Sequence, residues 1–150
     1  MQKRVSSLIV FAMFALVFSS SLVWSEEAAP SLYKRLGGYD ALAAVTDDFI
    51  GRLVTDPDLK RFFVGHSTNS LNRIRQLVVD QLCFATGGPC VYIGRDMKSA
   101  HAGMGISEVD WVKSETALVA TLDKFKVPEK EKGEVIAAIQ ALKKDIVETK

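Results

Sequence analysis

Apolar residues recur at intervals of three and four along most of the chain, which is the spacing that lines one face of an α-helix. Glycine and proline clusters such as Gly87-Gly88-Pro89 interrupt this pattern and predict where helices end. No convincing strand, repeat or low-complexity tract is present, so we expect an all-α fold. The predicted helices and helical turns are residues 31–36, 40–55, 59–63, 70–86, 107–125 and 128–146.

The first 25 residues have a different pattern. Two basic residues precede an apolar run at residues 5–18, and a small, polar stretch follows it. This order is typical of a secretory signal, and it predicts cleavage after Ser25 and one mature domain over residues 26–150. The alternative is an uncleaved anchor, because the run extended to residue 24 is about long enough to cross a bilayer. On both interpretations we expect an exported domain in, or facing, the periplasm, with a membrane as partner only if the segment stays uncleaved.

The charge balance and the two cysteines limit which partners and which cellular compartment the sequence allows. The 150 residues carry 19 basic and 18 acidic side chains without a basic block, which argues against a nucleic-acid partner. Both cysteines, Cys83 and Cys90, lie in the exported part. A disulfide between them requires Cα atoms within about 7 Å, which the intervening Gly-Gly-Pro turn allows. Two buried or free thiols are the alternative.

The chain has two histidines, His66 and His101, and neither stands in a zinc-type Cys/His spacing. His101 lies in a glycine-rich segment between two predicted helices. A neutral imidazole in an apolar helical chain can be the one protein ligand of a haem iron, although an ordinary core histidine is the commoner case. Because no Cys-x-x-Cys-His motif is present, the haem would be haem b rather than a covalently attached c-type haem.

Several motifs in order strengthen the haem interpretation. The motifs are Leu36-Gly37-Gly38, Asp48-Phe49, Phe62-Phe63, Gly87-Gly88-Pro89 and the run from Tyr92 through Gly94 and Met97 to His101, followed by Gly103 and Gly105-Ile106. Together they resemble the group 1 truncated haemoglobins from about Ser31 to the C-terminus, which implies a two-over-two helical sandwich around haem.

The resemblance implies roles for individual residues. His101 would bind iron through Nε2 and donate its Nδ1–H to a backbone carbonyl. Phe63 would stack on the haem, and Met97 would touch the face of the haem that His101 binds. The remaining candidates are Tyr92, Arg95 and Lys98 for the haem propionates, with surface roles as the alternative, and Ile106, Trp111, Ile74 and Val78 for apolar contact.

The opposite, distal side departs from the family pattern. Relatives often carry a tyrosine where this chain has Ile50, and a glutamine or histidine among the positions of Ile74, Leu77 and Val78. The predicted distal pocket is therefore apolar and leaves a five-coordinate ferrous iron that discriminates poorly against carbon monoxide. Its residues are Phe49, Ile50, Leu77 and Gln81, while His66 is interpreted as a surface residue.

Four functions are compatible with these residues. We expect binding of a diatomic gas (oxygen, carbon monoxide or nitric oxide) for oxygen transport or sensing. The alternative is a nitric oxide dioxygenase or peroxidase-like enzyme, which would need a distal acid–base group and an unidentified reductase. An exported electron-transfer or haem-holding protein, and a helical domain without cofactor, rank behind these two.

Overall fold

The structure is a computed structural model that describes residues 29–148. The predicted export segment, residues 1–25, lies outside the described residues, so the division into segment and domain stays a prediction. Within residues 29–148 no strand occurs, and none of the helices there is long and apolar enough to cross a membrane. The helices are α1 (Leu32–Arg35), α2 (Gly38–Thr55), η1 (Leu59–Phe63), α3 (Thr68–Ala85), α4 (Met97–His101), α5 (Glu108–Lys124), α6 (Glu129–Gln140) and α7 (Lys143–Ile146).

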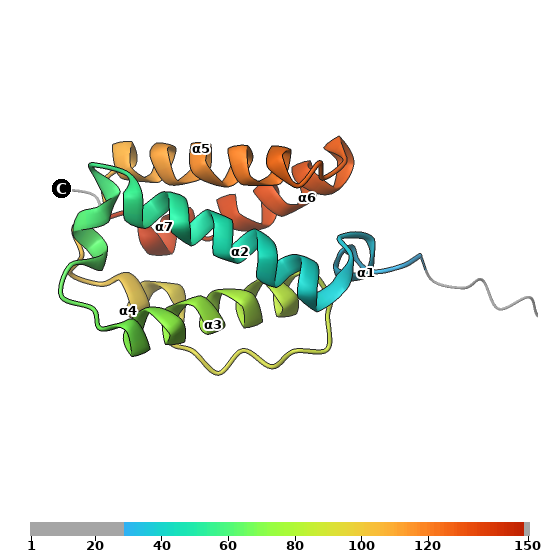
Figure 1. Cartoon of the computed structure of the whole chain (residues 1–150), viewed down its shortest axis with the longest axis horizontal. Helices are drawn as coiled ribbons and strands as arrows, with labels where there is room; N and C mark the ends of the chain where they lie inside the picture. Colours follow the sequence, from blue (N-terminus) through green and yellow to red (C-terminus); the bar gives the residue numbers. More distant parts are fainter. Residues whose placement is uncertain (1–28, 149–150) are drawn as a thin grey trace, which may run out of the picture.

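The long helices form two packed pairs, one over the other (Figure 1). Helix α2 packs along α3 in one pair, and α5 packs on α6 in the other. Contacts between α2 and α5 join the two pairs, and the short helix η1 touches both. The all-α, two-over-two architecture expected from the sequence is therefore confirmed.

Two apolar clusters fix this arrangement, and both include α2. One cluster joins α2 to α5 and α6 around Val45, Leu118 and Val135. The other joins α2 to α3 around Leu42 and Leu82. Since burial of one such side chain is worth about 1.5–3 kcal/mol, these contacts make α2 the helix on which both layers are built.

Helix α3 begins earlier than the sequence indicated. The expected N-cap was Ser70, but the Oγ of Ser67 accepts a hydrogen bond from the Ser70 backbone N at 3.2 Å, and the helix starts at Thr68. The backbone N of Leu71 also bonds to the Ser67 carbonyl at 3.0 Å. Both serines are good capping residues, and capping at Ser67 instead of Ser70 lengthens the helix by nearly one turn.

The C-terminal helix, expected to be continuous over residues 128–146, is broken after Gln140. The Leu142 backbone N bonds to the Ile139 carbonyl at 2.9 Å, and the Asp145 backbone N bonds to the Leu142 carbonyl at 3.0 Å. These tight turns separate α7 from α6. Helix α7 then packs on α4, which lies in the segment where the sequence predicted no element.

A disulfide closes the turn after α3. Cys83 and Cys90 form a disulfide, with their Cα atoms 5.7 Å apart. The structure therefore has the predicted disulfide and not the alternative of two free thiols. A Cβ on Gly88 would lie 2.5 Å from the Tyr33 ring and 2.7 Å from the Cys83 sulfur, so only glycine fits there. Because the Tyr33 backbone N donates to the Thr86 carbonyl at 2.8 Å, the start of the domain is fixed to the same turn.

Candidate functional site

His101 is the last residue of α4, a single helical turn. Asp96 caps this turn by accepting a hydrogen bond from the Ser99 backbone N at 2.9 Å. The Nδ1 of His101 lies 2.8 Å from the carbonyl oxygen of Met97, four residues back. A carbonyl oxygen only accepts hydrogen bonds, so Nδ1 carries the proton and Nε2 keeps its lone pair. The imidazole is thereby held in the orientation and tautomer that bind a metal through Nε2.

The site is supported from behind by the C-terminal end of the domain. Helix α4 is too short to hold its own position, and it packs on α7. The Glu148 backbone N also donates to the Ile106 carbonyl at 2.8 Å, just beyond the glycine-rich turn that follows His101. Ile106 itself is buried. Helix α7 and Glu148 therefore position the histidine segment.

The pair Phe62-Phe63 lies at the end of η1, and an ion pair holds this short helix in place. The Nη2 of Arg61 donates to both carboxylate oxygens of Asp110, at 2.7 and 2.8 Å. Asp110 is 4% exposed and also accepts from the Ser107 backbone N at 2.9 Å, which completes a capping box at the start of α5. The guanidinium carbon of Arg61 stands 4.3 Å from the centre of the Phe62 ring. The aromatic pair is thereby fixed relative to α5.

The electrostatics of Asp110 follow from these contacts. Burial by itself raises the pKa of a carboxyl group, because it disfavours the charge. Hydrogen bonds from Ser107 and Arg61 outweigh burial and hold the pKa of Asp110 below its ordinary value. The group is therefore an anion at neutral pH, and it ties η1 to α5.

A second carboxylate joins α2 to α5. Asp48 accepts hydrogen bonds from Lys124, from Arg52 at 2.7 Å and from the Thr121 hydroxyl at 2.9 Å. The bonds from Lys124 and Arg52 hold its pKa far below the ordinary range. This contact fixes α2, the helix that carries Phe49 and Ile50.

The predicted distal residues share one face of α3. Ile74, Leu77, Val78 and Gln81 are spaced by three and four residues, and all four are half-buried, whereas the adjoining Val79 is fully buried. Ile50, on α2, is half-buried as well. Neither apolar cluster includes Ile50, Ile74 or Leu77. Ile50, Ile74 and Leu77 are thus partly exposed apolar side chains outside both core clusters, whereas Val78 packs against the cluster around Leu42.

A buried indole provides a test of whether the site fits a cofactor. Trp111 is 5% exposed, and its Nε1–H has no acceptor among the described residues. A buried donor without a partner costs about 1–3 kcal/mol, so an orphan of this kind indicates a missing partner at this position. Trp111 follows the ion-paired Asp110, close to η1. The indole donor, the partly exposed apolar positions of α3 and the Nε2 of His101 are chemically suited to a large apolar group with polar edges, as haem has.

The remaining candidates have simpler surroundings. The Tyr92 hydroxyl donates to the Arg95 carbonyl at 2.7 Å, so it braces the loop before α4, and burial raises the pKa of this hydroxyl. The side chains of Arg95 and Lys98 are exposed. Met97 and Phe63 are half-buried. His66 is exposed in the break between η1 and α3, as expected for a surface residue.

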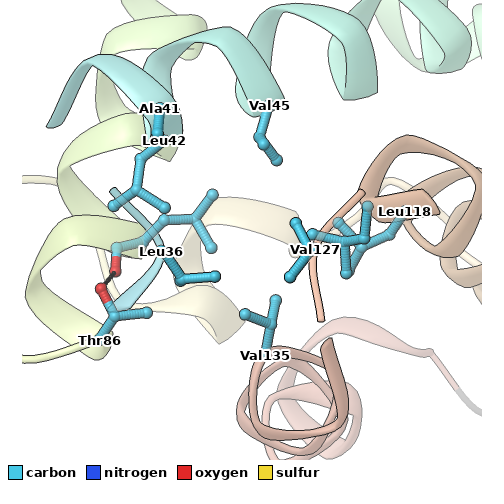
Figure 2. A pocket seen from close by; sticks show the side chains of 10 residues that line it. Leu36, Ala41, Leu42, Val45, Thr86, Leu118, Val127 and Val135 are labelled. Atoms are coloured by element: carbon cyan, nitrogen blue, oxygen red, sulfur yellow. Dashed lines mark hydrogen bonds between the residues drawn. The ribbon is translucent and has the colours of Figure 1, made fainter. Parts of the chain in front are cut away.

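One small cavity lies elsewhere in the fold. Figure 2 shows apolar side chains from α2, α5 and α6 converging on it. Its volume is about 20 Å³, room for roughly one water molecule. None of the residues predicted to contact haem lines it, so it is a packing defect of the core rather than the site. Its labelled lining residues are Leu36, Ala41, Leu42, Val45, Thr86, Leu118, Val127 and Val135.

Metal binding by side chains alone is not indicated in the described part of the chain, where no group of three or more His, Cys, Asp or Glu residues converges. An iron held by His101 therefore needs its other ligands from a macrocycle.

The Arg61–Asp110 pair and the Asp48 cluster are not among the residues predicted from the sequence. Arg52 and Asp48 are four residues apart, a spacing that was visible in the sequence. Nothing local indicated that Arg61 would meet a carboxylate 49 residues away.

Comparisons with known proteins agree with this geometry. Residues 31–148 match the family model described as bacterial-like globin. The chain is a bacterial-like globin. A group 1 truncated hemoglobin from Mycolicibacterium paratuberculosis is 34% identical over 116 residues, covering 77% of this chain and 83% of the relative. The group 1 truncated hemoglobin of Tetrahymena thermophila is 30% identical over 116 residues, covering 77% and 93%.

Solved structures show the same fold. The crystal structure of truncated hemoglobin from Tetrahymena pyriformis in the Fe(III) form superposes with a TM-score of 0.73 at 27% identity, covering 80% of this chain and all of that chain. This globin thus belongs with the group 1 truncated haemoglobins, a family that implies haem iron.

Proposed function

We propose that this globin holds haem b through the Nε2 of His101 and binds a diatomic gas on the opposite face. The observation that carries the proposal is the 2.8 Å contact between His101 Nδ1 and the Met97 carbonyl, which leaves Nε2 as a preset ligand. Haem supplies an iron with one open coordination position. The residues of this chain orient the imidazole, provide the aromatic pair of η1 and keep water away.

The apolar face of α3 supports an oxygen-transport or sensing role rather than catalysis. Ile50 and Ile74 carry no polar group, and the Gln81 amide is the one hydrogen-bond donor of the predicted distal set. Oxygen gains about 1.5–3 kcal/mol from a strong distal hydrogen bond, whereas carbon monoxide gains less. We therefore propose a site that releases oxygen quickly and discriminates poorly against carbon monoxide. Dioxygenase and peroxidase chemistry rank lower, because both need a stabilising or proton-donating group on this side.

Absorption spectra of the haem-loaded protein test this function. We expect a five-coordinate ferrous spectrum that converts fully on addition of carbon monoxide. His101→Ala should abolish it, and His66→Ala, which removes the exposed histidine, should leave it unchanged. A six-coordinate ferrous spectrum would favour electron transfer, and absence of haem binding by the parent chain would overturn the proposal.

We further propose that residues 1–25 direct export and that the domain folds outside the cytoplasm. The disulfide geometry at Cys83 and Cys90 supports this, since such bonds persist in oxidising compartments. Fractionation of producing cells, with the thiol count of the recovered protein, tests it. Reduced protein confined to the cytoplasm would contradict it.

A further inference from the structure

The loop between the disulfide and α4 carries apolar side chains that point away from the domain. Val91 is 74% exposed and Ile93 is 82% exposed, and Phe84, beside the other cysteine of the disulfide, is 60% exposed. Between Val91 and Ile93, Tyr92 is half-buried, and its hydroxyl bonds to the Arg95 carbonyl at 2.7 Å. In an extended segment alternate side chains point to opposite sides, so an inward Tyr92 turns both of its neighbours outward.

This apolar surface, Phe84, Val91 and Ile93, is held in shape rather than loose. The disulfide joins the residue before Phe84 to the residue before Val91. The inward tyrosine fixes the middle of the loop. Three exposed apolar side chains held at one turn can pack together against an apolar partner.

The described part of the chain begins next to this loop. The Tyr33 backbone N bonds to the Thr86 carbonyl, and a Cβ on Gly87 would stand 3.2 Å from the Ser31 Cβ, so the domain begins against the turn that opens this loop. Figure 1 shows the start of the domain and the start of the loop at the same end. The 28 residues before this point include the apolar run at residues 5–18.

We propose that the N-terminal segment is retained in the membrane and that the surface of Phe84, Val91 and Ile93 rests on the lipid headgroup and acyl boundary. Apolar side chains flanked by basic ones suit this boundary, and the exposed Arg95 and Lys98 follow the loop. This proposal takes the uncleaved anchor in place of the cleaved signal predicted from the sequence. It requires export and an intact segment, and it is independent of which gas the site binds.

The test uses the full chain purified from membranes, placed in vesicles of phosphatidylcholine and phosphatidylglycerol that contain a photoactivatable phosphatidylcholine. After illumination, lipid adducts are mapped by mass spectrometry. We expect residues 84–95 to carry about tenfold more adduct than residues 107–113. The second region is the internal control, because Val109 and Val112 are also exposed apolar residues, and their helix α5 lies on the opposite edge of the molecule from the loop in Figure 1.

Matched variants complete the test. Val91→Asp with Ile93→Asp should lower the adduct on residues 84–95 about tenfold, and Val109→Asp with Val112→Asp should leave it unchanged. An unaltered haem spectrum shows that each variant is folded. Three results would overturn the proposal: protein that begins after Ser25 and is recovered in the soluble fraction, adducts equal in the two regions, or contact of the loop with a second copy of the chain instead of lipid.

Discussion

Replacing Asp110 with asparagine tests whether the buried ion pair holds η1, and with it the aromatic pair, against α5. Asparagine keeps the size of the side chain but has only one oxygen. That oxygen can accept a hydrogen bond from Ser107 or from Arg61, but not from both in the native geometry. The amide nitrogen replaces the other carboxylate oxygen, and because it is a donor it faces the remaining donor without an acceptor between them. We expect the variant to keep the hydrogen bond from Ser107, which is only three residues away, and to lose the bonds from Arg61, which is 49 residues away.

The expected loss in free energy of unfolding depends on how deeply Asp110 and Arg61 are buried. Breaking a fully buried pair costs about 3–5 kcal/mol, but the Arg61 side chain is half-exposed and regains water. The loss in free energy of unfolding should therefore be about 2–3 kcal/mol. Asp58→Asn is the control, because the ion pair of Asp58 with Lys113 also joins the start of η1 to α5 but is exposed on both sides. It should cost less than about 1 kcal/mol.

Urea unfolding of the two variants and the parent, at identical haem loading and pH 7, measures these differences. Equal losses for Asp110→Asn and Asp58→Asn would refute the argument that burial decides the strength of the contact. A loss below about 0.5 kcal/mol for Asp110→Asn would show that the pair does not hold η1.

Other predictions concern the turn, the pH dependence and the distal side. Cys83→Ala with Cys90→Ala should lower the free energy of unfolding by roughly 2–2.5 kcal/mol, as loop entropy predicts for a separation of 7 residues, and an undiminished urea midpoint would contradict this. Gly88→Ala should lower the thermal midpoint, because its Cβ would meet the Tyr33 ring at 2.5 Å. The pKa of Asp48 is lowered in the folded state, so its contribution is present above the unfolded pKa of about 3.9 and is lost as the pH falls below it. Asp48→Asn should therefore destabilise the protein at pH 7 and flatten the decline in stability between about pH 5 and pH 2, measured by chemical unfolding across that range. Ile50→Tyr should slow oxygen dissociation about 10- to 100-fold in stopped-flow experiments, and an unchanged rate would mean that residue 50 does not face the ligand.

The sequence alone determined the helical class, most helix boundaries and the segment that carries His101. These are local properties: the spacing of apolar residues sets which face of a helix is buried, and glycine and proline end helices wherever they stand. The half-buried face of α3 could be inferred for the same reason, since Ile74, Leu77 and Val78 share a face in any α-helix.

The tertiary structure decided what depends on distant partners. The break between α6 and α7 follows from tight turns, and it allows α7 to pack on α4. No glycine or proline near Gln140 predicted this break in the sequence. Arg61 meets Asp110 across 49 residues, and the start of the domain meets the disulfide turn, because packing rather than local pattern brings these groups together. The spacing of apolar residues predicts whether a side chain is buried or exposed, but only the folded chain shows which residues it packs against.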